Sequence, residues 1–172
     1  KSLSVRMVER ASASNGELDM NCSKIFFVLA AAACLQIGAA SAADKGNAED
    51  AVKLMNKAEK HYKEAGKEKA LADFTNDKTN FVDRDLYLFC FNKTDGHWTA
   101  HGNNPALIGR DLLQIKDANG KLFGGEMKQV VADMKEGWVD YMWMNPTTKK
   151  IDAKTSFVRG IGDQICGVGI YK

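Results

Sequence analysis

The stretch from Gly137 to Arg159 constrains the fold more than any other part of the chain, because it has the pattern of two strands joined by a polar turn. Asn145-Pro146-Thr147-Thr148 favours a turn between two β-rich runs, which predicts a hairpin with a loop longer than two residues. Side chains of a strand alternate between its two faces. One face of the first strand then holds Val139, Tyr141 and Trp143, and the other holds Trp138, Asp140, Met142 and Met144. Neither set is plainly polar, so we expect both faces to be partly covered.

The aromatic face of this hairpin has two interpretations. Tyr141 and Trp143, next to a strand that carries Lys154, can form an apolar surface with one positive group that binds a small anion. Alternatively, the rings only fill a hydrophobic core. Residue types alone leave both open.

The first part of the chain is predicted to be a leader sequence. Residues 1–19 have no apolar period, and we expect an unstructured upstream segment there. Residues 20–42 have the pattern of a secretory signal peptide, with an uncharged run from Ile25 to Leu35 and small residues Ala40-Ser41-Ala42 before the cleavage point. Residues 43–172 are then long enough for one domain but too short for two. The predicted location is the periplasm.

Two other fates of the leader stay open. Ile25 to Ala43 can remain uncleaved and tether the protein to the inner membrane, although the run is barely long enough to span a bilayer and is interrupted by polar residues. Cys34 follows Ala32-Ala33 as in a lipoprotein signal, but Ala31 stands where such signals have a branched residue. Cleavage after Ala42 is the alternative we favour.

Charge and cysteine content fit an exported protein without a nucleic-acid partner. The chain has 24 basic and 22 acidic residues, and removal of the leader takes away four of the former and three of the latter. This near balance gives no electrostatic reason to expect nucleic acid. Cys90 and Cys166 remain, each in a predicted strand, and they either form a disulfide in an oxidising compartment or stay buried thiols.

The remaining elements are predicted from periodicity. A helix capped by Asn47 runs to Gly66, with lysines on its outer face, and a shorter helical piece covers residues 69–74. Residues 76–85 are polar and predicted to be a loop. Strands follow at Leu86–Phe91, at Trp98–His101 and at Gln164–Tyr171, with helical turns at 106–113 and a helix at 126–135. Gly167 and Gly169 alternate in the last strand, which indicates either close approach of another group or tight packing.

Sequence motifs give no support for a metal site or for catalysis. His97 and His101 have the spacing of zinc-binding helices, but their surroundings favour a strand, where such residues stand about 13 Å apart. No haem-attachment motif, phosphate loop or nucleophile elbow is present, so we expect no cofactor. No nucleophile, base and orienting group can be assembled, and we therefore predict that the protein is not an enzyme.

Seven short motifs occur in order between Ala51 and Lys172. They are Gly66–Ala70, Asp85–Phe89, His101–Gly109, Asp117–Lys121, Gly137–Trp143, Lys154–Val158 and Gly167–Tyr171. In this order they resemble a known family, the single Cache domains of the second type, which are bacterial extracytoplasmic sensors with a PAS-like sheet. The resemblance implies an α+β fold in which a long N-terminal helix precedes a five-stranded antiparallel sheet.

The resemblance also implies a function, which is binding of a small molecule, often a short carboxylate, for signal transduction or chemotaxis. The aromatic pair of the family falls on Tyr141 and Trp143, its basic residue on Lys154 and its loop histidine on His101. Lys154 is then expected to pair with the carboxylate and Tyr141 to hydrogen-bond it, while Trp143 and Phe123 exclude water.

Two departures from the family pattern affect these expectations. The family usually has proline after the loop histidine, whereas Gly102 stands here, so we expect a looser loop. The sequence stops at Lys172, directly after the last predicted strand, so we expect a free-standing binding protein that presents its ligand to a separate membrane receptor or kinase.

Other partner surfaces remain open. The N-terminal helix, from Val52 to Tyr62, is a candidate homodimer contact. The alternative function is a structural or interaction domain without a ligand, with its partner surface formed by Trp98, Trp138, Met142 and Met144.

Overall fold

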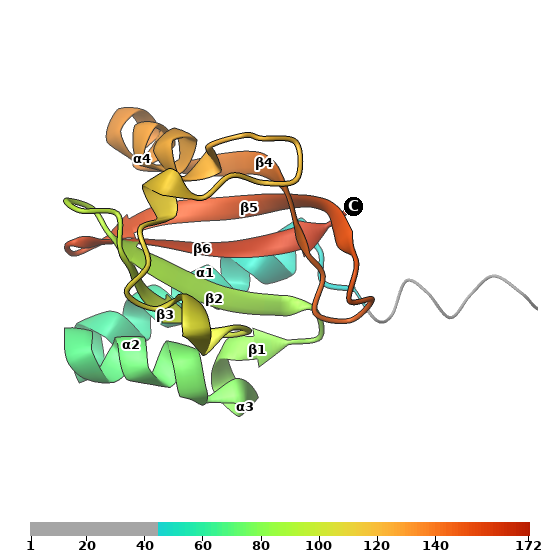
Figure 1. Ribbon diagram of the computed structural model, residues 1–172. Helices are drawn as coiled ribbons and strands as arrows, with labels where there is room; N and C mark the ends of the chain where they lie inside the picture. Colours follow the sequence, from blue (N-terminus) through green and yellow to red (C-terminus); the bar gives the residue numbers. More distant parts are fainter. Residues whose placement is uncertain (1–44) are drawn as a thin grey trace, which may run out of the picture. The chain divides into compact units, whose positions relative to one another are not determined.

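Residues 45–172 are described by a computed structural model, and their first element is the predicted N-terminal helix, α1 (Ala48–Ala65) (Figure 1). Asn47 and Asp50 form a capping box at its start, which satisfies backbone donors that the helix itself leaves free. Gly66 ends the helix with a positive φ of 81°, a conformation that glycine adopts without steric cost. The predicted upstream segment and signal peptide, residues 1–19 and 20–42, lie outside the described residues.

The sheet contains six antiparallel strands. They are β1 (Val82–Asp83), β2 (Leu86–Asn92), β3 (Trp98–His101), β4 (Glu136–Met144), β5 (Ile151–Ile161) and β6 (Gln164–Tyr171). Their order is β1-β2-β6-β5-β4, and β3 pairs with β2. The predicted α+β class, a long helix followed by an antiparallel sheet, is confirmed. The sixth strand, β1, is only two residues long and was not expected.

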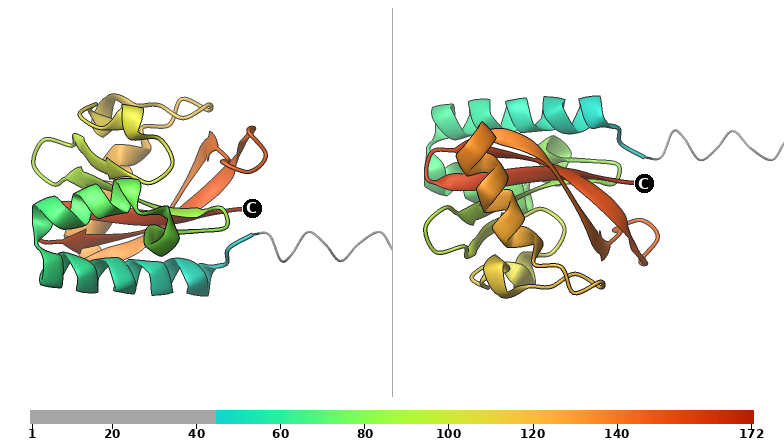
Figure 2. Two further views of the ribbon diagram at one scale, coloured as in Figure 1. Left: turned by 90° about the horizontal axis from the view of Figure 1, so that it is seen from below. Right: turned by 90° about the horizontal axis from the view of Figure 1, so that it is seen from above.

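One face of the sheet is covered by α1 and α2 (Lys67–Asn76), as Figure 2 shows. Leu54, Met55 and Phe74 from these helices pack on Leu88 and Val168 of the two central strands. Helix α2 is longer at both ends than the predicted piece at 69–74. The expectation of a loop at 76–85 is wrong in part, because α3 (Lys78–Phe81) forms there and buries the Phe81 ring against Phe74.

The other face is covered by α4 (Phe123–Met134) and by two 3₁₀ turns, η1 (Pro105–Leu107) and η2 (Leu112–Gln114) (Figure 2). Side chains of these segments and of the sheet form a second buried cluster, which includes Phe91, Leu112, Met127 and Val158. No helix within residues 45–172 has the length and hydropathy needed to cross a membrane.

The hairpin predicted between Gly137 and Arg159 is confirmed as β4 and β5, in register from Glu136–Arg159 to Met144–Ile151. The expectation that both of its faces are partly covered is confirmed, but the two faces are covered to different extents. Val139 and Tyr141 are buried toward α4, whereas Trp138 is 39% exposed and Met144 is 45% exposed on the opposite face. Strand β4 lies at the edge of the sheet, where Trp138 packs against Phe157 but no helix covers it.

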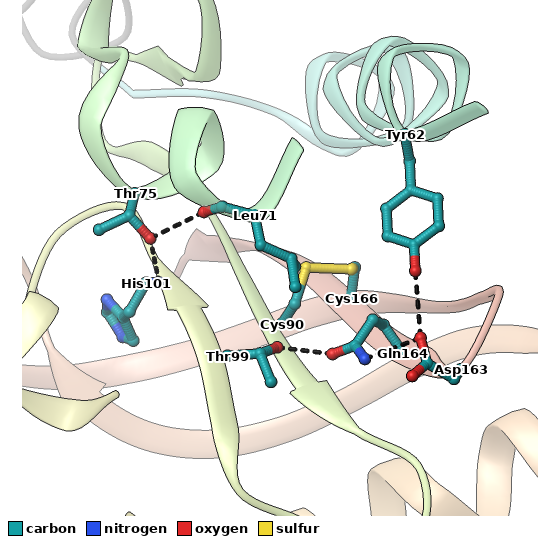
Figure 3. The surroundings of a disulfide bond; sticks show 9 residues. All are labelled: Tyr62, Leu71, Thr75, Cys90, Thr99, His101, Asp163, Gln164 and Cys166. Atoms are coloured by element: carbon teal, nitrogen blue, oxygen red, sulfur yellow. Dashed lines mark hydrogen bonds between the residues drawn. A yellow bond between two sulfur atoms is a disulfide. The ribbon is translucent and has the colours of Figure 1, made fainter. Parts of the chain in front are cut away.

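Cys90 of β2 and Cys166 of β6 stand directly opposite each other and are joined by a disulfide, with an S–S distance of 2.07 Å. Both residues are fully buried, and Leu71 of α2 points toward the bond from the helical layer (Figure 3). The disulfide links strands that are 76 residues apart in sequence.

Candidate functional site

The residues predicted to bind a ligand lie on the face of the sheet that α4 covers. Strand alternation directs Tyr141 and Trp143 of β4 and Lys154 of β5 to this face. Phe123, the first residue of α4, packs over them. His101 comes from β3, beyond β2, and is connected to the others through the Tyr87 ring, whose centroid lies 5.1 Å from that of His101.

Lys154 is the central feature of this face because its whole side chain is buried, with 1% exposure. Its Nζ donates a hydrogen bond to the hydroxyl of Tyr87 at 2.8 Å. The same nitrogen lies 4.0 Å from the centroid of the Tyr87 ring and 4.9 Å from that of Tyr171. Among residues 45–172, no carboxylate lies within ion-pair distance of it, and a buried charge without a counter-charge is costly.

The electrostatics of Lys154 follow from this burial. Removal of water holds the pKa of its amine well below the usual value, and the charge of Asp85 opposes that effect. Burial also raises the pKa of the Tyr87 hydroxyl well above its usual value, so this hydroxyl stays neutral. When it is protonated, Lys154 is a positive group in an apolar setting, where an added anion is attracted strongly.

Gly169 of β6 creates the space that Lys154 occupies. A Cβ atom at this position would overlap Cε of Lys154 and Oγ of Ser156. The second alternating glycine, Gly167, leaves room in the same way for the ring of Phe89. The interpretation of these glycines as points of close approach is therefore supported at both positions.

We expect Gly169→Ala to displace the Lys154 side chain and to lower the free energy of unfolding by about 1–3 kcal/mol, the usual cost of overpacking a core. Gly125→Ala is the matched control, because a Cβ there meets nothing within 4 Å and alanine favours the helix. Urea unfolding of both variants checks this. Equal stability of Gly169→Ala and the wild type would contradict the proposed packing.

The aromatic part of the site is tightly packed. The rings of Phe123 and Tyr141 are stacked, with centroids 4.3 Å apart and an interplanar angle of 6°. Trp143 meets the Phe123 ring edge-on at 5.4 Å and is only partly buried, so it lies at the border of the cluster. The Tyr141 hydroxyl forms a hydrogen bond of 2.9 Å with Oγ of Ser156, and burial raises its pKa well above the usual value.

His101 is buried and neutral. Its Nδ1 accepts hydrogen bonds from the backbone amides of Asn103 and Asn104, at 3.3 and 2.9 Å, which places the ring proton on Nε2. Burial, and then the charge of Lys154, lowers the pKa of this imidazole to about 3. His101 can therefore donate a hydrogen bond through Nε2 but carries no charge at neutral pH.

The loop after His101 differs from the sequence-based expectation. The expectation of a looser loop at Gly102 is wrong, because both backbone groups of Gly102 are hydrogen-bonded. Its amide donates to the Leu88 carbonyl, and its carbonyl accepts from Nζ of Lys78. A Cβ at Gly102 would lie 3.1 Å from the Leu88 carbonyl oxygen and 3.2 Å from that of Phe74. The glycine thus permits a close approach of this loop to the sheet.

The neutrality of His101 predicts a loss of stability in mild acid. Unfolded histidine takes up a proton near pH 6.5, whereas folded His101 does so only near pH 3, so the unfolded state binds more protons as the pH falls below 6.5. Between pH 7 and pH 5 this costs about 2 kcal/mol of unfolding free energy. We expect His101→Gln to lose less stability over the same range in urea titrations. Identical pH dependence of the two proteins would contradict the buried neutral state.

Sequence reasoning missed three polar groups of this face. The Tyr87 hydroxyl is bonded to Lys154, and the Tyr171 hydroxyl is bonded to that of Tyr87. Trp98 packs against Phe89 and His101, and its buried indole N–H has no partner among residues 45–172. The alternation of Tyr87 with Phe89, and of Tyr171 with the two glycines, is visible in the sequence. The alternative interpretation placed Trp98 on a partner surface, and this placement is wrong because Trp98 is only 3% exposed.

Other parts of the described chain offer no comparable arrangement. A hollow of about 330 Å³ lies along α1 between Asn56 and Glu64, and one of about 350 Å³ lies along α2 beside Thr99 and Ile108. Both are open to solvent; the first is lined largely by charged side chains, and the second mainly by uncharged ones. Within residues 45–172, no group of three metal-binding side chains comes together.

Comparison with known proteins relates this architecture to one family. A family model described as a Cache domain (dCache_2) matches residues 45–171. The chain is also similar to solved structures of sensor domains. One is a methyl-accepting chemotaxis protein from Vibrio parahaemolyticus RIMD 2210633, with 21% identity and a TM-score of 0.62, covering 72% of this chain and 86% of that one.

Two further structures support the same fold. A periplasmic sensor domain of a chemotaxis protein has 26% identity and a TM-score of 0.58, with 72% of this chain and 88% of that chain covered. A Cache chemosensory domain, reported with the basis of its carboxylic acid recognition, has 24% identity and a TM-score of 0.56, with 72% and 86% covered.

Proposed function

The chain belongs to the Cache domain family, and on this premise we propose that it is a periplasmic sensor domain that binds a short organic carboxylate beside the ammonium group of Lys154. Cache sensor domains are non-catalytic and bind small-molecule ligands, so binding rather than turnover is the activity to be explained. The observation that carries the proposal is the complete burial of Lys154 without a carboxylate partner among residues 45–172.

Each predicted residue has a distinct role in this proposal. Lys154 supplies the charge for the carboxylate, and hydrogen bonds to an ionised group are stronger than neutral ones. The Tyr141 hydroxyl and Nε2 of His101 are neutral donors to its oxygens. Phe123 and Trp143 exclude water, which strengthens the charge pairing. Aromatic walls with few placed polar groups are the usual composition of small-molecule sites.

The packing of these rings limits the size of the ligand. Phe123 stacks on Tyr141 at 4.3 Å, so a ligand must fit beside this pair or separate the rings. Trp143 lies at the partly exposed border of the cluster, and we propose that the ligand enters beside it. A carboxylate with a short chain meets this requirement better than a bulky acid.

Periplasmic location and membrane partners also belong to the proposal. Disulfides persist in oxidising compartments, so the Cys90–Cys166 bond supports export through the predicted leader, residues 20–42. The similar structures are chemotaxis sensors, which supports a chemoreceptor or kinase as the recipient of the signal, in the same polypeptide or a separate one. We also propose that the chain belongs to the single-Cache class of the second type and that it dimerises through α1.

A thermal-shift screen tests the proposed binding. We expect one or more of acetate, propionate and pyruvate to raise the melting temperature, because a ligand at 100 times its Kd adds about 2.7 kcal/mol of stability. Acetamide and propionamide are the matched controls, since they have nearly the same shape without the charge. Equal effects of acids and amides, or no effect of any acid, would contradict the proposal.

A second candidate is supported by one surface feature. Trp138, Met144 and Ile151 are 39%, 45% and 46% exposed on the side of the hairpin that no helix covers. An apolar surface of this kind can contact a protein partner. A protein that binds none of the acids, but loses a native partner on Trp138→Ser substitution, would favour the interaction-domain alternative.

A further inference from the structure

Tyr171, the last residue of β6, is connected to the Lys154 ammonium through the hydroxyl of Tyr87. The Tyr171 hydroxyl donates a hydrogen bond to the backbone carbonyl of Met144, at the end of β4, at 2.7 Å. It also lies 3.3 Å from the Tyr87 hydroxyl, which accepts from Nζ of Lys154 at 2.8 Å. Four groups on four strands therefore form one chain of hydrogen bonds.

For the ammonium form of Lys154, the donor and acceptor inventory fixes the direction of this chain. An ammonium group can only donate and a carbonyl oxygen can only accept, so Lys154 donates to Tyr87 and Tyr171 donates to Met144. The proton of Tyr87 must then point to the free lone pair of Tyr171. The Tyr87 hydroxyl then donates to Tyr171 and only accepts from the ammonium.

We propose that Tyr171 is a positioning residue of the ligand site, which keeps Tyr87 as an acceptor and so favours the charged form of Lys154. The inference rests on the proposed function, because the charged form is the one that pairs with a carboxylate. Without the Tyr171 hydroxyl, the proton of Tyr87 loses its acceptor. The nitrogen of Lys154 already shares a hydrogen bond with this hydroxyl, and it can accept the proton only as a neutral amine.

Among residues 45–172, no other titratable group around the ammonium is hydrogen-bonded to Lys154. The titratable side chains that surround it are Asp85, Tyr87, His101, Tyr141 and Tyr171. Asp85 accepts from the amide of Gly46 at 2.6 Å, and its second oxygen is buried without a partner among residues 45–172. The Tyr141 hydroxyl is bonded to Ser156, and Nδ1 of His101 accepts from two backbone amides. Within the described residues, the Tyr87 oxygen is the acceptor to which Lys154 donates.

Tyr171→Phe tests this inference, because it removes the hydroxyl and keeps the ring beside the ammonium. The NMR signal of the Lys154 Cε is followed as a function of pH in the full chain, and is assigned by its loss in Lys154→Met. We expect Tyr171→Phe to lower the midpoint of this titration by about one pH unit, and to weaken propionate binding by about tenfold at pH values above the wild-type midpoint. Tyr62→Phe is the matched control, since its hydroxyl bonds to Asp163 on the helical side of the molecule.

The outcomes separate the two proposals. A lowered midpoint without any carboxylate binding would support the role of Tyr171 and refute the proposed function. Binding by the wild type, with the same midpoint and affinity in Tyr171→Phe, would overturn the role of Tyr171 alone. Tyr87→Phe provides a second variant: it should lower the midpoint as well, and the double variant should show no further drop, because both changes break one chain.

Discussion

Replacement of Lys154 by methionine is expected to weaken the binding of short carboxylates by at least about 100-fold, the scale for loss of one partner of a buried charge pair. The same change should leave the free energy of unfolding equal to that of the wild type or above it. Methionine fills a similar volume and removes a charge that the unliganded protein buries without a counter-charge. Calorimetric titration and urea unfolding of one preparation measure both effects.

The control for this prediction is Lys150→Met, which removes a lysine from the exposed tip of the same hairpin. It should bind carboxylates as the wild type does. A Lys154→Met protein that retains full affinity would show that the anion binds elsewhere. A variant that loses several kcal/mol of stability would show that the ammonium has a structural partner that these contacts do not reveal.

Loss of the disulfide is the second large effect that we expect. A Cys90→Ala/Cys166→Ala protein should lose about 4 kcal/mol of unfolding free energy, because the bond closes a long loop in the unfolded chain. This corresponds to a fall in melting temperature of about 15 °C. Calorimetry of the variant, and of the wild type with a reducing agent, should give the same shift.

Peptide mapping after alkylation without reductant provides the control, since the wild type should yield a linked Cys90–Cys166 peptide. Recovery of both cysteines as alkylated thiols would contradict the bond. Unchanged stability of the double variant would show that β2 and β6 are held together by their backbone pairing and by the surrounding core alone.

The sequence predicted the individual strands better than their neighbours in the sheet. The period of two in residues 137–143 correctly placed Val139 and Tyr141 on one buried face. It did not reveal that β4 lies at the edge, which leaves Trp138 exposed. Coverage of a strand depends on which helices reach it, and this information is not contained in the strand's own residues.

The same limit explains why two residues of the site were not predicted from the sequence. Lys154 and Phe123 were expected beside Tyr141, and the structure brings them to one face. Tyr87 and Tyr171 were missed because β6, the last strand of the sequence, lies between β2 and β5. This order brings the two tyrosine rings beside the lysine, and antiparallel strand order cannot be derived from alternation. The alternation of Gly169 with Gly167 was visible in the sequence, but the reason for Gly169 is the Lys154 side chain that packs against it.

The most direct test of the account follows the Cε signal of Lys154 by NMR while propionate is added to the wild-type protein. The account predicts that saturation with propionate raises the midpoint of the lysine titration, because the carboxylate stabilises the ammonium form, and that propionamide leaves it unchanged. If propionate binds and the Lys154 titration does not move, the buried ammonium is not the group that recognises the ligand.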